Sequence, residues 1–392
     1  MMVTAFKNFK IIRHGEISPF TDLLVSDGKI IGIGHELKAD RYIDGKGEFW
    51  LSAGFIDIHT HGGGGYDFMD ADPDEYVGVA RNHAKFGATS LYPTTVSASR
   101  EELLATLRAF EEAQKKNDGA NLLGIHLEGP YISPEQCGAM DPKYIRTSDK
   151  AEYSEMFALS KNIRRMTIAP ELPGSAELGR YMRENGIIGS IGHTSGLAED
   201  VIDMHYEGGY NLMTHLYSCM TLTTRRNAWR HAGAVEASYL LDDMYVEAIA
   251  DGCHLPKELL KLIYKIKGPD KIVLVTDSMR AAGMGEGVFR FGSRANGYDI
   301  IVEDGVAKLM DRTAFAGSVA TPDRLVRTMV DMAEVPLAKA VKMITETPAK
   351  VMGIFNERGS LDDGKAADIT VFDDKIRVQL TMVGGEVVYT KE

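Results

Sequence analysis

Two histidines, His59 and His61, end a short apolar run in the segment GFIDIHTHGGGGYDF, residues 54–68. Alternate residues of an extended strand face the same side, so both imidazole rings can converge on one ion. A polar strand end that faces solvent has the same pattern, and glycines follow the pair at once. The pair alone therefore leaves two interpretations open, a corner of a metal site or an ordinary loop.

Other residues able to bind a metal stand at or just after the ends of further apolar runs: Glu128, His193, His215, His254 and Asp277. Imidazole nitrogens and carboxylate oxygens are the ligands of hydrolytic Zn²⁺ or Fe²⁺ sites, which keep one position open for water or substrate. Six of these residues are enough for two ions: His59, His61, Glu128, His193, His215 and Asp277. We expect Glu128 to bridge them, with one ion on His59, His61 and Asp277 and the other on His193 and His215.

The chain between about residues 53 and 350 predicts the elements that position these groups. Apolar runs alternate with helical patterns, which is typical of repeated βα units and a parallel sheet. The helical patterns include residues 73–86, 100–116 and 176–185. The candidate strands are 55–60, 89–94, 122–128, 165–170, 187–194, 210–216, 245–251 and 271–277. These strands predict an α/β fold of the (β/α)₈ barrel type, in which catalytic groups come from the C-terminal strand ends.

The two ends of the chain have a different texture. Short apolar runs separated by Asp-Gly and Gly-rich turns fill the first 50 residues and return in the last 35. Such segments predict strands joined by tight turns. We expect both ends to pair into one small β-sandwich, formed by residues 1–52 and 353–392, beside a barrel of residues 53–352.

The overall composition excludes some classes of partner. A net charge of −12 argues against nucleic acid, because a phosphate backbone needs clustered Lys and Arg. Cys137, Cys219 and Cys253 are widely spaced and odd in number, so they predict neither a disulfide framework nor a zinc knuckle. No signal-peptide pattern and no long apolar stretch is present, so we expect no membrane contact and a cytoplasmic location.

Several motifs together resemble one enzyme family. GFIDIHTHG, GIHLEGPYISPEQCGAM, IGHTSG, MTHLYSCM, IADGCHLP, VTDSMRAAG and FAGS stand in the order and at the spacing typical of the amidohydrolase superfamily. Within it, the chain resembles the N-acetylglucosamine-6-phosphate deacetylases over essentially its whole length. The resemblance implies a metal-dependent hydrolase that removes the N-acetyl group of a hexosamine 6-phosphate, giving acetate and the free amine.

The resemblance also implies roles for particular residues. Glu128, His193 and His215 would hold the essential divalent metal, Zn²⁺ or Fe²⁺ with Mn²⁺ as an alternative, and a second ion per subunit stays open. Asp277 would act as general base and then as general acid. Its other interpretation, a helix N-cap, explains none of the remaining strand ends.

For the substrate pocket, the resemblance implies that Arg226 and His254 bind the phosphate. It implies a homodimer in which the loop of Arg226 reaches the neighbouring subunit's site. The other substrate-lining residues that it implies are Ala139, Met140, Ser218, Cys219, Phe315, Ala316, Gly317 and Ser318.

Three departures from the family pattern affect residues that line the substrate pocket. Met140 stands where many members have a histidine that helps to polarise the substrate carbonyl, and methionine cannot donate a hydrogen bond. A second ion held by His59 and His61 would supply that electrophile instead. Ser218 and the segment after Arg226 also differ from the common pattern. These two differences leave the gluco or galacto epimer of the sugar, or another N-acyl amino sugar, open.

Two alternatives have distinct sequence signatures. A dihydroorotase or an N-acyl amino acid hydrolase commonly carries a carboxylated lysine where this chain has Glu128. A catalytically inactive barrel used for binding predicts loss of ligand residues, whereas each expected metal position and Asp277 are occupied. Both features favour the sugar deacetylase.

Overall fold

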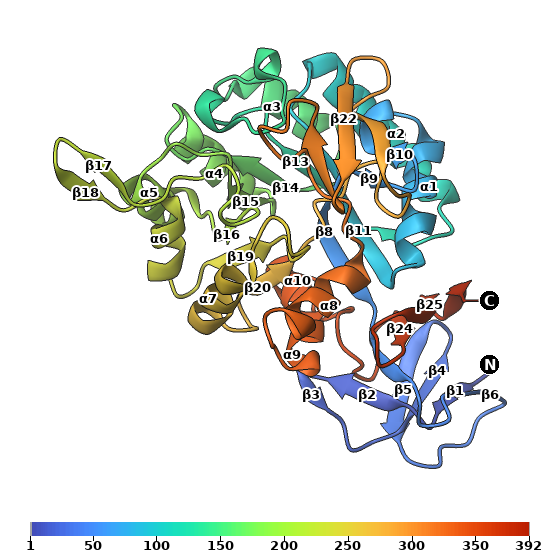
Figure 1. Ribbon diagram of the computed structural model, residues 1–392. Coiled ribbons are helices and arrows are strands. Elements are labelled where there is room, and N and C mark those ends of the chain that lie inside the picture. Colours follow the sequence, from blue (N-terminus) through green and yellow to red (C-terminus); the bar gives the residue numbers. More distant parts are fainter. Residues whose placement is uncertain (1, 392) are drawn as a thin grey trace.

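Eight parallel strands form a nearly closed barrel in the computed structural model, which describes residues 2–391 (Figure 1). Neighbours follow the order β8, β11, β13, β14, β15, β16, β19, β20. Their bounds are Phe55–Thr60, Ala88–Thr95, Ile125–Glu128, Ile163–Ile168, Ile188–Ile191, Leu212–Met213, Tyr245–Ala248 and Ile272–Leu274. The last strand returns to the first where Asp277 N donates to His59 O at 2.8 Å. The eight predicted strands and the barrel are confirmed.

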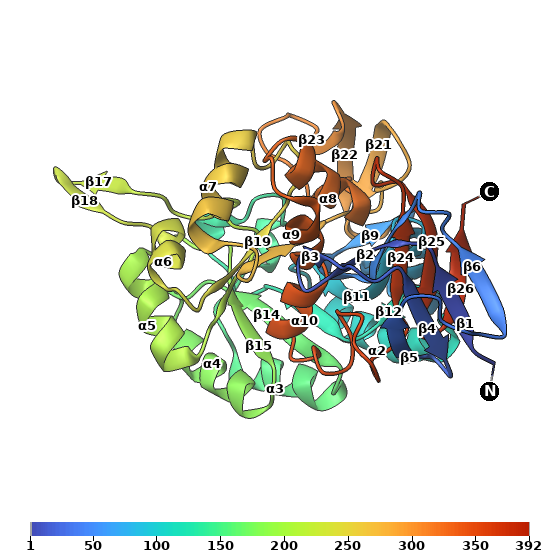
Figure 2. The same cartoon turned by 90° about the horizontal axis from the view of Figure 1, so that it is seen from below.

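Helices alternate with the strands around the outside of the barrel (Figure 2). Helix α2 shows why they form: Ser99 and Glu102 make a capping box at its start, while Leu103, Leu107 and Phe110 bury one face. The helices are α1 Pro73–Ala84, α2 Arg100–Lys116, α3 Lys150–Leu159, α4 Ser175–Glu184, α5 Ala198–Gly208, α6 Ala234–Leu240, α7 Lys257–Lys267, α8 Pro322–Asp331, α9 Leu337–Lys342 and α10 Glu346–Val351. The three predicted helical segments coincide with α1, α2 and α4.

Both chain ends form β-sheets beside the barrel (Figure 2). A six-stranded sheet has the order β26-β25-β24-β7-β2-β3 and so joins the two ends, with β7 antiparallel to β24. A four-stranded sheet has the order β5-β4-β1-β6. Phe6, Ile11, Leu51 and Ile369 share a buried apolar core between them. The strands are β1 Thr4–Lys7, β2 Lys10–Arg13, β3 Glu16–Ile17, β4 Asp22–Ser26, β5 Lys29–Gly34, β6 Arg41–Asp44, β7 Trp50–Ala53, β24 Ile369–Phe372, β25 Val378–Val383 and β26 Glu386–Thr390.

Two antiparallel insertions interrupt the βα repeat. One is a three-stranded sheet between β20 and α8, formed by β21 Gly287–Phe291, β22 Tyr298–Glu303 and β23 Val306–Leu309. The other is the hairpin of β17 Thr224–Arg226 and β18 Trp229–His231, which projects away from the barrel in both views (Figures 1 and 2). Neither insertion is predicted by the alternation of apolar runs and helices.

The glycines after His61 form the tight turn between β9 Gly62–Gly63 and β10 Tyr66–Asp67. A Cβ on Gly62 would lie 2.4 Å from Tyr66 O, and one on Gly63 would lie 2.8 Å from Asn82 Nδ2. Side chains at these positions would therefore collide with the turn itself and with α1. Within residues 2–391, none of the helices combines the length and the hydropathy required to cross a lipid bilayer.

Candidate metal centre and active site

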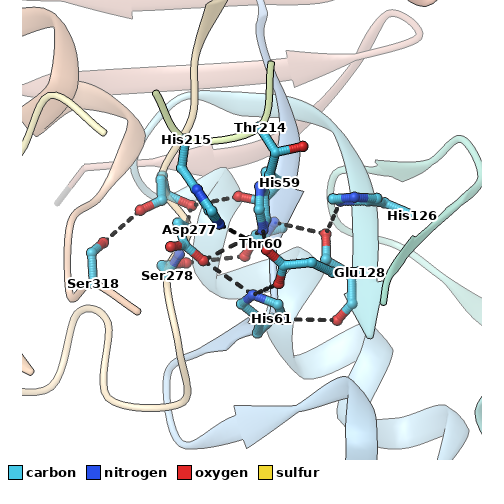
Figure 3. A network of polar contacts seen from close by, with 12 residues as sticks. His59, Thr60, His61, His126, Glu128, Thr214, His215, Asp277, Ser278 and Ser318 are labelled. Carbon is cyan, nitrogen blue, oxygen red and sulfur yellow. Dashed lines mark hydrogen bonds and ion pairs between the residues drawn. The ribbon is translucent and has the colours of Figure 1, made fainter. Parts of the chain in front are cut away.

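Six side chains able to bind a metal converge at the carboxyl-terminal mouth of the barrel, and Figure 3 shows five of them, His59, His61, Glu128, His215 and Asp277. They fall into two groups. Within each group, the ligand atoms lie within 4.8 Å of one another. The first ligand group is His59, His61 and Asp277, and the second ligand group is Glu128, His193 and His215. All six are buried. The structure thus brings together the six residues predicted to hold metal, with Glu128 grouped with His193 and His215, while the remaining strand-end histidine, His254, belongs to neither group.

Close contacts inside the first ligand group involve the Nε2 atoms of both histidines. His61 Nε2 lies 3.0 Å from Asp277 Oδ1, and His59 Nε2 lies 3.5 Å from the same oxygen (Figure 3). The two rings come from one strand end, and Asp277 follows β20, the strand that closes the barrel onto β8. Barrel closure therefore assembles this group.

Glu128 makes the contacts that connect the two groups. Its Oε1 lies 2.9 Å from His215 Nε2 and 3.2 Å from His193 Nε2, while its Oε2 lies 3.2 Å from His61 Nε2. Oε1 also lies 3.5 Å from His59 Nε2, so the carboxylate contacts histidines of both groups. Glu128 thus lies where the two ligand groups meet.

Hydrogen bonds at the other ring nitrogen fix the tautomer of three of the histidines. His61 Nδ1 lies 3.1 Å from Thr94 O, and His193 Nδ1 lies 2.7 Å from Gln136 O. A carbonyl oxygen only accepts, so Nδ1 donates in both cases, and the neutral ring carries its lone pair on Nε2. His59 Nδ1 donates in the same way to the carboxylate of Glu247 at 3.0 Å. All three rings therefore present Nε2 to the centre, as metal ligation requires.

Two further observations fit a cation at this position. His59 Nε2 is buried without a hydrogen-bond partner among residues 2–391, although polar atoms surround it. His193 Nε2 and His215 Nε2 lie only 3.1 Å apart, an arrangement that an ion between two lone pairs explains. The residues present fit a divalent metal.

The electrostatics of the centre also favour positive charge. Burial by itself lowers the pKa of His59, but the charges of Glu128, Glu247 and Asp277 outweigh it and raise that pKa to about 10. Burial likewise opposes a raised pKa at His61, whose hydrogen bonds with Asp277 and Glu128 nevertheless raise it to about 9. Without an ion, the buried carboxylates thus favour protons on the histidines, and a divalent cation takes the same place.

Three of the six residues have left-handed backbone conformations. The φ angles are 49° at His193, 30° at His215 and 47° at Asp277. Such angles cost energy in residues other than glycine and persist where the surroundings impose them. They occur here just beyond the strand ends, where the chain turns and directs the side chains into the barrel mouth. Residues with positive φ also occur in turns elsewhere in the chain, for example Asn8 and Asp27, so the angles describe how the side chains are directed and not what they do.

A cavity of about 210 Å³ opens directly above the two ligand groups. Most of the predicted substrate residues line it: Ala139, Met140, Ser218, Cys219, His254, Phe315 and Gly317. Ala316 and Ser318 do not, and Ser318 instead donates from N to Asp277 O at 2.7 Å. Ser318 therefore supports the segment that carries Asp277.

Arg226 lies away from the cavity of its own chain. It is exposed at the end of β17 and is not part of the cavity wall. The hairpin of β17 and β18 projects from the barrel (Figure 2). His254, by contrast, is held at the cavity by Asp251, whose Oδ2 lies 2.8 Å from His254 Nδ1. The ring of His254 also packs on Phe315, with 4.7 Å between the centroids.

The cavity includes residues that sequence reasoning missed. Gly138, Phe291 and Ala314 line it, and Phe291 comes from β21 of the inserted sheet. A Cβ on Gly138 would lie 2.7 Å from Cys219 Sγ, which explains the glycine there. These residues carry no ligand atom, so their types offered no signal of their location.

Comparison with known proteins identifies the family of this chain. The model of the Amidohydrolase family matches residues 50–388, which is most of the chain. The chain belongs to the amidohydrolase family. It is 32% identical to the N-acetylglucosamine-6-phosphate deacetylase of Bacillus subtilis, over 98% of this chain and 96% of the relative. It is also 32% identical to the N-acetylgalactosamine-6-phosphate deacetylase of Escherichia coli O157:H7, over 86% of this chain and 87% of the relative.

Solved structures of this family have the same fold. The N-acetylglucosamine-6-phosphate deacetylase of Pasteurella multocida superposes with a TM-score of 0.91 at 29% identity, covering 99% of this chain and all of that chain. An Asp-to-Ala mutant of the Mycobacterium smegmatis enzyme, in complex with N-acetyl-D-glucosamine 6-phosphate, superposes with a TM-score of 0.89 at 29% identity, and 99% of each chain is covered. The sandwich and the barrel thus match along the whole chain.

Proposed function

We propose that this protein hydrolyses the N-acetyl amide of N-acetylglucosamine 6-phosphate, giving glucosamine 6-phosphate and acetate. The observation that carries the proposal is the pair of ligand groups, Asp277 among them, at the floor of a cavity of about 210 Å³. The similarity to deacetylases along nearly the entire chain supports the same reaction. Glu128 in place of a lysine separates it from amidohydrolases that depend on a carboxylated lysine.

In the proposed reaction, Asp277 transfers a proton from water to the leaving nitrogen. Burial alone would raise its pKa, but the charges of His59 and His61 lower it, so the carboxylate form prevails. Asp277 accepts a proton from the attacking water and then donates it to the amide nitrogen, which leaves as the amine. A divalent ion held by the ligand groups supplies a Lewis acid that polarises the amide carbonyl and makes water more acidic.

The metal requirement is part of the proposal. Zn²⁺ and Fe²⁺ suit the imidazole and carboxylate donors best, and Mn²⁺ is also accepted by such sites. Since both ligand groups are complete, two ions per chain would be held there, one by His59, His61 and Asp277 and the other by Glu128, His193 and His215. Met140 supports this, because a thioether in the cavity wall cannot polarise a carbonyl.

We further propose that the phosphate of the substrate is bound by His254 and by Arg226 of a neighbouring subunit. The projecting hairpin holds Arg226 away from its own cavity, so only a second copy of the chain would receive it. Arg is well suited to bidentate phosphate binding. This makes a homodimer a requirement of the active form.

A test of this arrangement is the variant Arg226→Ala. We expect KM for the phosphorylated substrate to rise by about 10- to 100-fold with a smaller change in kcat, because charged hydrogen bonds contribute about 1.5–3 kcal/mol. Arg225→Ala is the matched control, since neighbouring residues of a strand face opposite sides. Mixing Arg226→Ala with Asp277→Asn subunits should restore activity in hybrid dimers. Failure of the mixture to regain activity would contradict a shared site.

An acetate-release assay tests the reaction itself. The substrates are N-acetylglucosamine 6-phosphate, its galacto epimer and unphosphorylated N-acetylglucosamine. We expect kcat/KM for the phosphorylated gluco substrate to exceed that of the free sugar by about 100-fold or more, because the phosphate contacts are charged. The E. coli relative makes N-acetylgalactosamine 6-phosphate the second candidate substrate, and a higher kcat/KM for the galacto epimer would favour it. Equal rates with and without phosphate would contradict the phosphate site.

The domain limits and the cellular location complete the proposal. We divide the chain into a barrel of residues 53–352 and a sandwich of residues 1–52 and 353–392, which is supported by the shared sheet of β7 and β24. A cytoplasmic location suits a protein that hydrolyses a sugar phosphate and that has free Cys137, Cys219 and Cys253.

A further inference from the structure

A buried ion pair lies directly beneath the first ligand group. Arg165, in β14, and Glu247, in β19, both have side chains without solvent exposure, and Arg165 Nη1 donates to Glu247 Oε1. These strands are not neighbours in the barrel, so the pair spans its interior. Burying two charges is costly unless further hydrogen bonds compensate for lost water. The contacts that the pair makes must therefore offset this cost.

Arg165 is held by the surrounding strands. Its Nε donates to Ser190 Oγ at 2.9 Å, and its Nη2 donates to Thr214 Oγ1 at 2.9 Å. Its Nη1 also donates to Ile58 O at 3.2 Å. These contacts come from three different barrel segments, so the guanidinium has little freedom. It holds Oε1 of Glu247 in one place.

Glu247 uses its other oxygen for the metal centre. Oε2 accepts from His59 Nδ1 at 3.0 Å and from the backbone N of His215 at 3.0 Å. One oxygen thus orients a ring of the first ligand group and supports the left-handed backbone of a residue in the second. Because His59 donates from Nδ1, its Nε2 is the ring nitrogen that faces Asp277 and Glu128, each at 3.5 Å.

We propose that Glu247, held by Arg165, is a positioning residue that fixes the proton of His59 on Nδ1 and so makes the first ligand group able to retain its ion. A carboxylate hydrogen-bonded to a ligating histidine is a known way of fixing its tautomer. The inference rests on the proposed two-ion form of the site. It assigns Glu247 no contact with the substrate.

The substitution Glu247→Gln reverses this arrangement. Arg165 only donates, so the carbonyl oxygen of glutamine must face it, and the NH₂ group then faces His59 Nδ1. His59 must accept there, which moves its proton to Nε2 and removes the lone pair needed for ligation. His61 and Asp277 then hold the first ion without His59.

The test compares manganese binding in the purified full-length wild type and Glu247→Gln. Each protein is titrated with Mn²⁺, and bound metal is followed by elemental analysis and by electron paramagnetic resonance. Two adjacent ions, about 3.5–4 Å apart, couple magnetically and differ in spectrum from a single ion. We expect two coupled ions in the wild type. In the variant, we expect one ion of unchanged affinity and one weakened by about 10- to 100-fold.

Controls separate positioning from folding. Asp368→Asn removes a buried carboxylate from another arginine pair, with Arg358 Nη1 at 2.9 Å, in the chain-end region, and should leave both ions bound. If Glu247→Gln does not fold, the double variant Arg165→Leu/Glu247→Leu removes both charges together and should lose the same ion. Circular dichroism checks the fold of each protein.

Two results would overturn the inference. One is a folded Glu247→Gln protein that binds two coupled Mn²⁺ ions with wild-type affinity. The other is a wild type that binds a single ion while still releasing acetate, which would leave the deacetylase function intact and remove the site that Glu247 is proposed to serve. A third result would contradict the proposed function alone: a wild type that binds two coupled ions but releases acetate from no amino-sugar phosphate.

Discussion

Replacing Asp277 with asparagine is expected to lower kcat for acetate release by about 10²- to 10⁴-fold, the range that general acid–base catalysis contributes. Asparagine keeps the shape and an oxygen able to contact His61, which lies 3.0 Å from Asp277 Oδ1 in the wild type. It cannot accept and return a proton. We therefore expect substrate binding to persist, measured by calorimetry, while turnover measured by acetate release nearly stops.

Metal analysis of the same variant separates the two roles of Asp277, which belongs to the first ligand group and is also the proposed base. A protein that keeps its wild-type metal content and loses turnover supports proton transfer as the main role. Asp363→Asn, at an exposed position, is a control for the loss of an acidic side chain. A kcat within about tenfold of wild type, at full metal content, would place the base elsewhere.

The barrel could be predicted because its strands follow one simple rule. Each is a short apolar run, and polar residues begin where it ends, as at His59 and Glu128. Since parallel strands bring their carboxyl ends to one edge, the order of the runs was enough to bring the ligands together. The spacing of His59 and His61 on one strand indicated the first ligand group, and the resemblance to deacetylases implied that Glu128, His193 and His215 hold the other ion.

The insertion of β21, β22 and β23 could not be predicted from that rule, because it breaks the βα alternation. A local signal was present: Asp304 and Gly305 both have positive φ, as expected of a two-residue hairpin turn. Its effect on the cavity, through Phe291, depends on how the insertion folds over the barrel mouth. No local pattern contains that information.

Arg165 and Glu247 show a second limit. Each is a charged residue within an apolar strand, which is a readable sign of an unusual environment. Their partnership joins two strands that are not adjacent, so it requires the closed barrel. Arg226 shows a third limit, because a single chain places it on an exposed hairpin and its proposed target belongs to another copy.

The second large expected effect is the loss of kcat on removing one ion, and it follows from Met140, which stands in place of a histidine. The resemblance to other deacetylases implies that such a histidine polarises the substrate carbonyl, whereas Met140 only accepts a hydrogen bond from Ser97 Oγ at 3.0 Å. We expect His59→Asn to remove one of two ions and to lower kcat by about 10²- to 10³-fold, because a metal Lewis acid contributes several kcal/mol.

Met140→His then provides a direct test of compensation in the His59→Asn background. Met140 lines the cavity, so a histidine there can donate to the carbonyl in place of the missing ion. We expect the double variant to recover at least about tenfold in kcat over His59→Asn, and the same substitution to give no such gain in the wild type, where two ions already act. Kinetics and metal analysis of the four proteins complete the cycle. One ion per chain in the active wild type, together with an unchanged rate in His59→Asn, would refute the two-metal mechanism and leave the second ligand group as the only catalytic metal site.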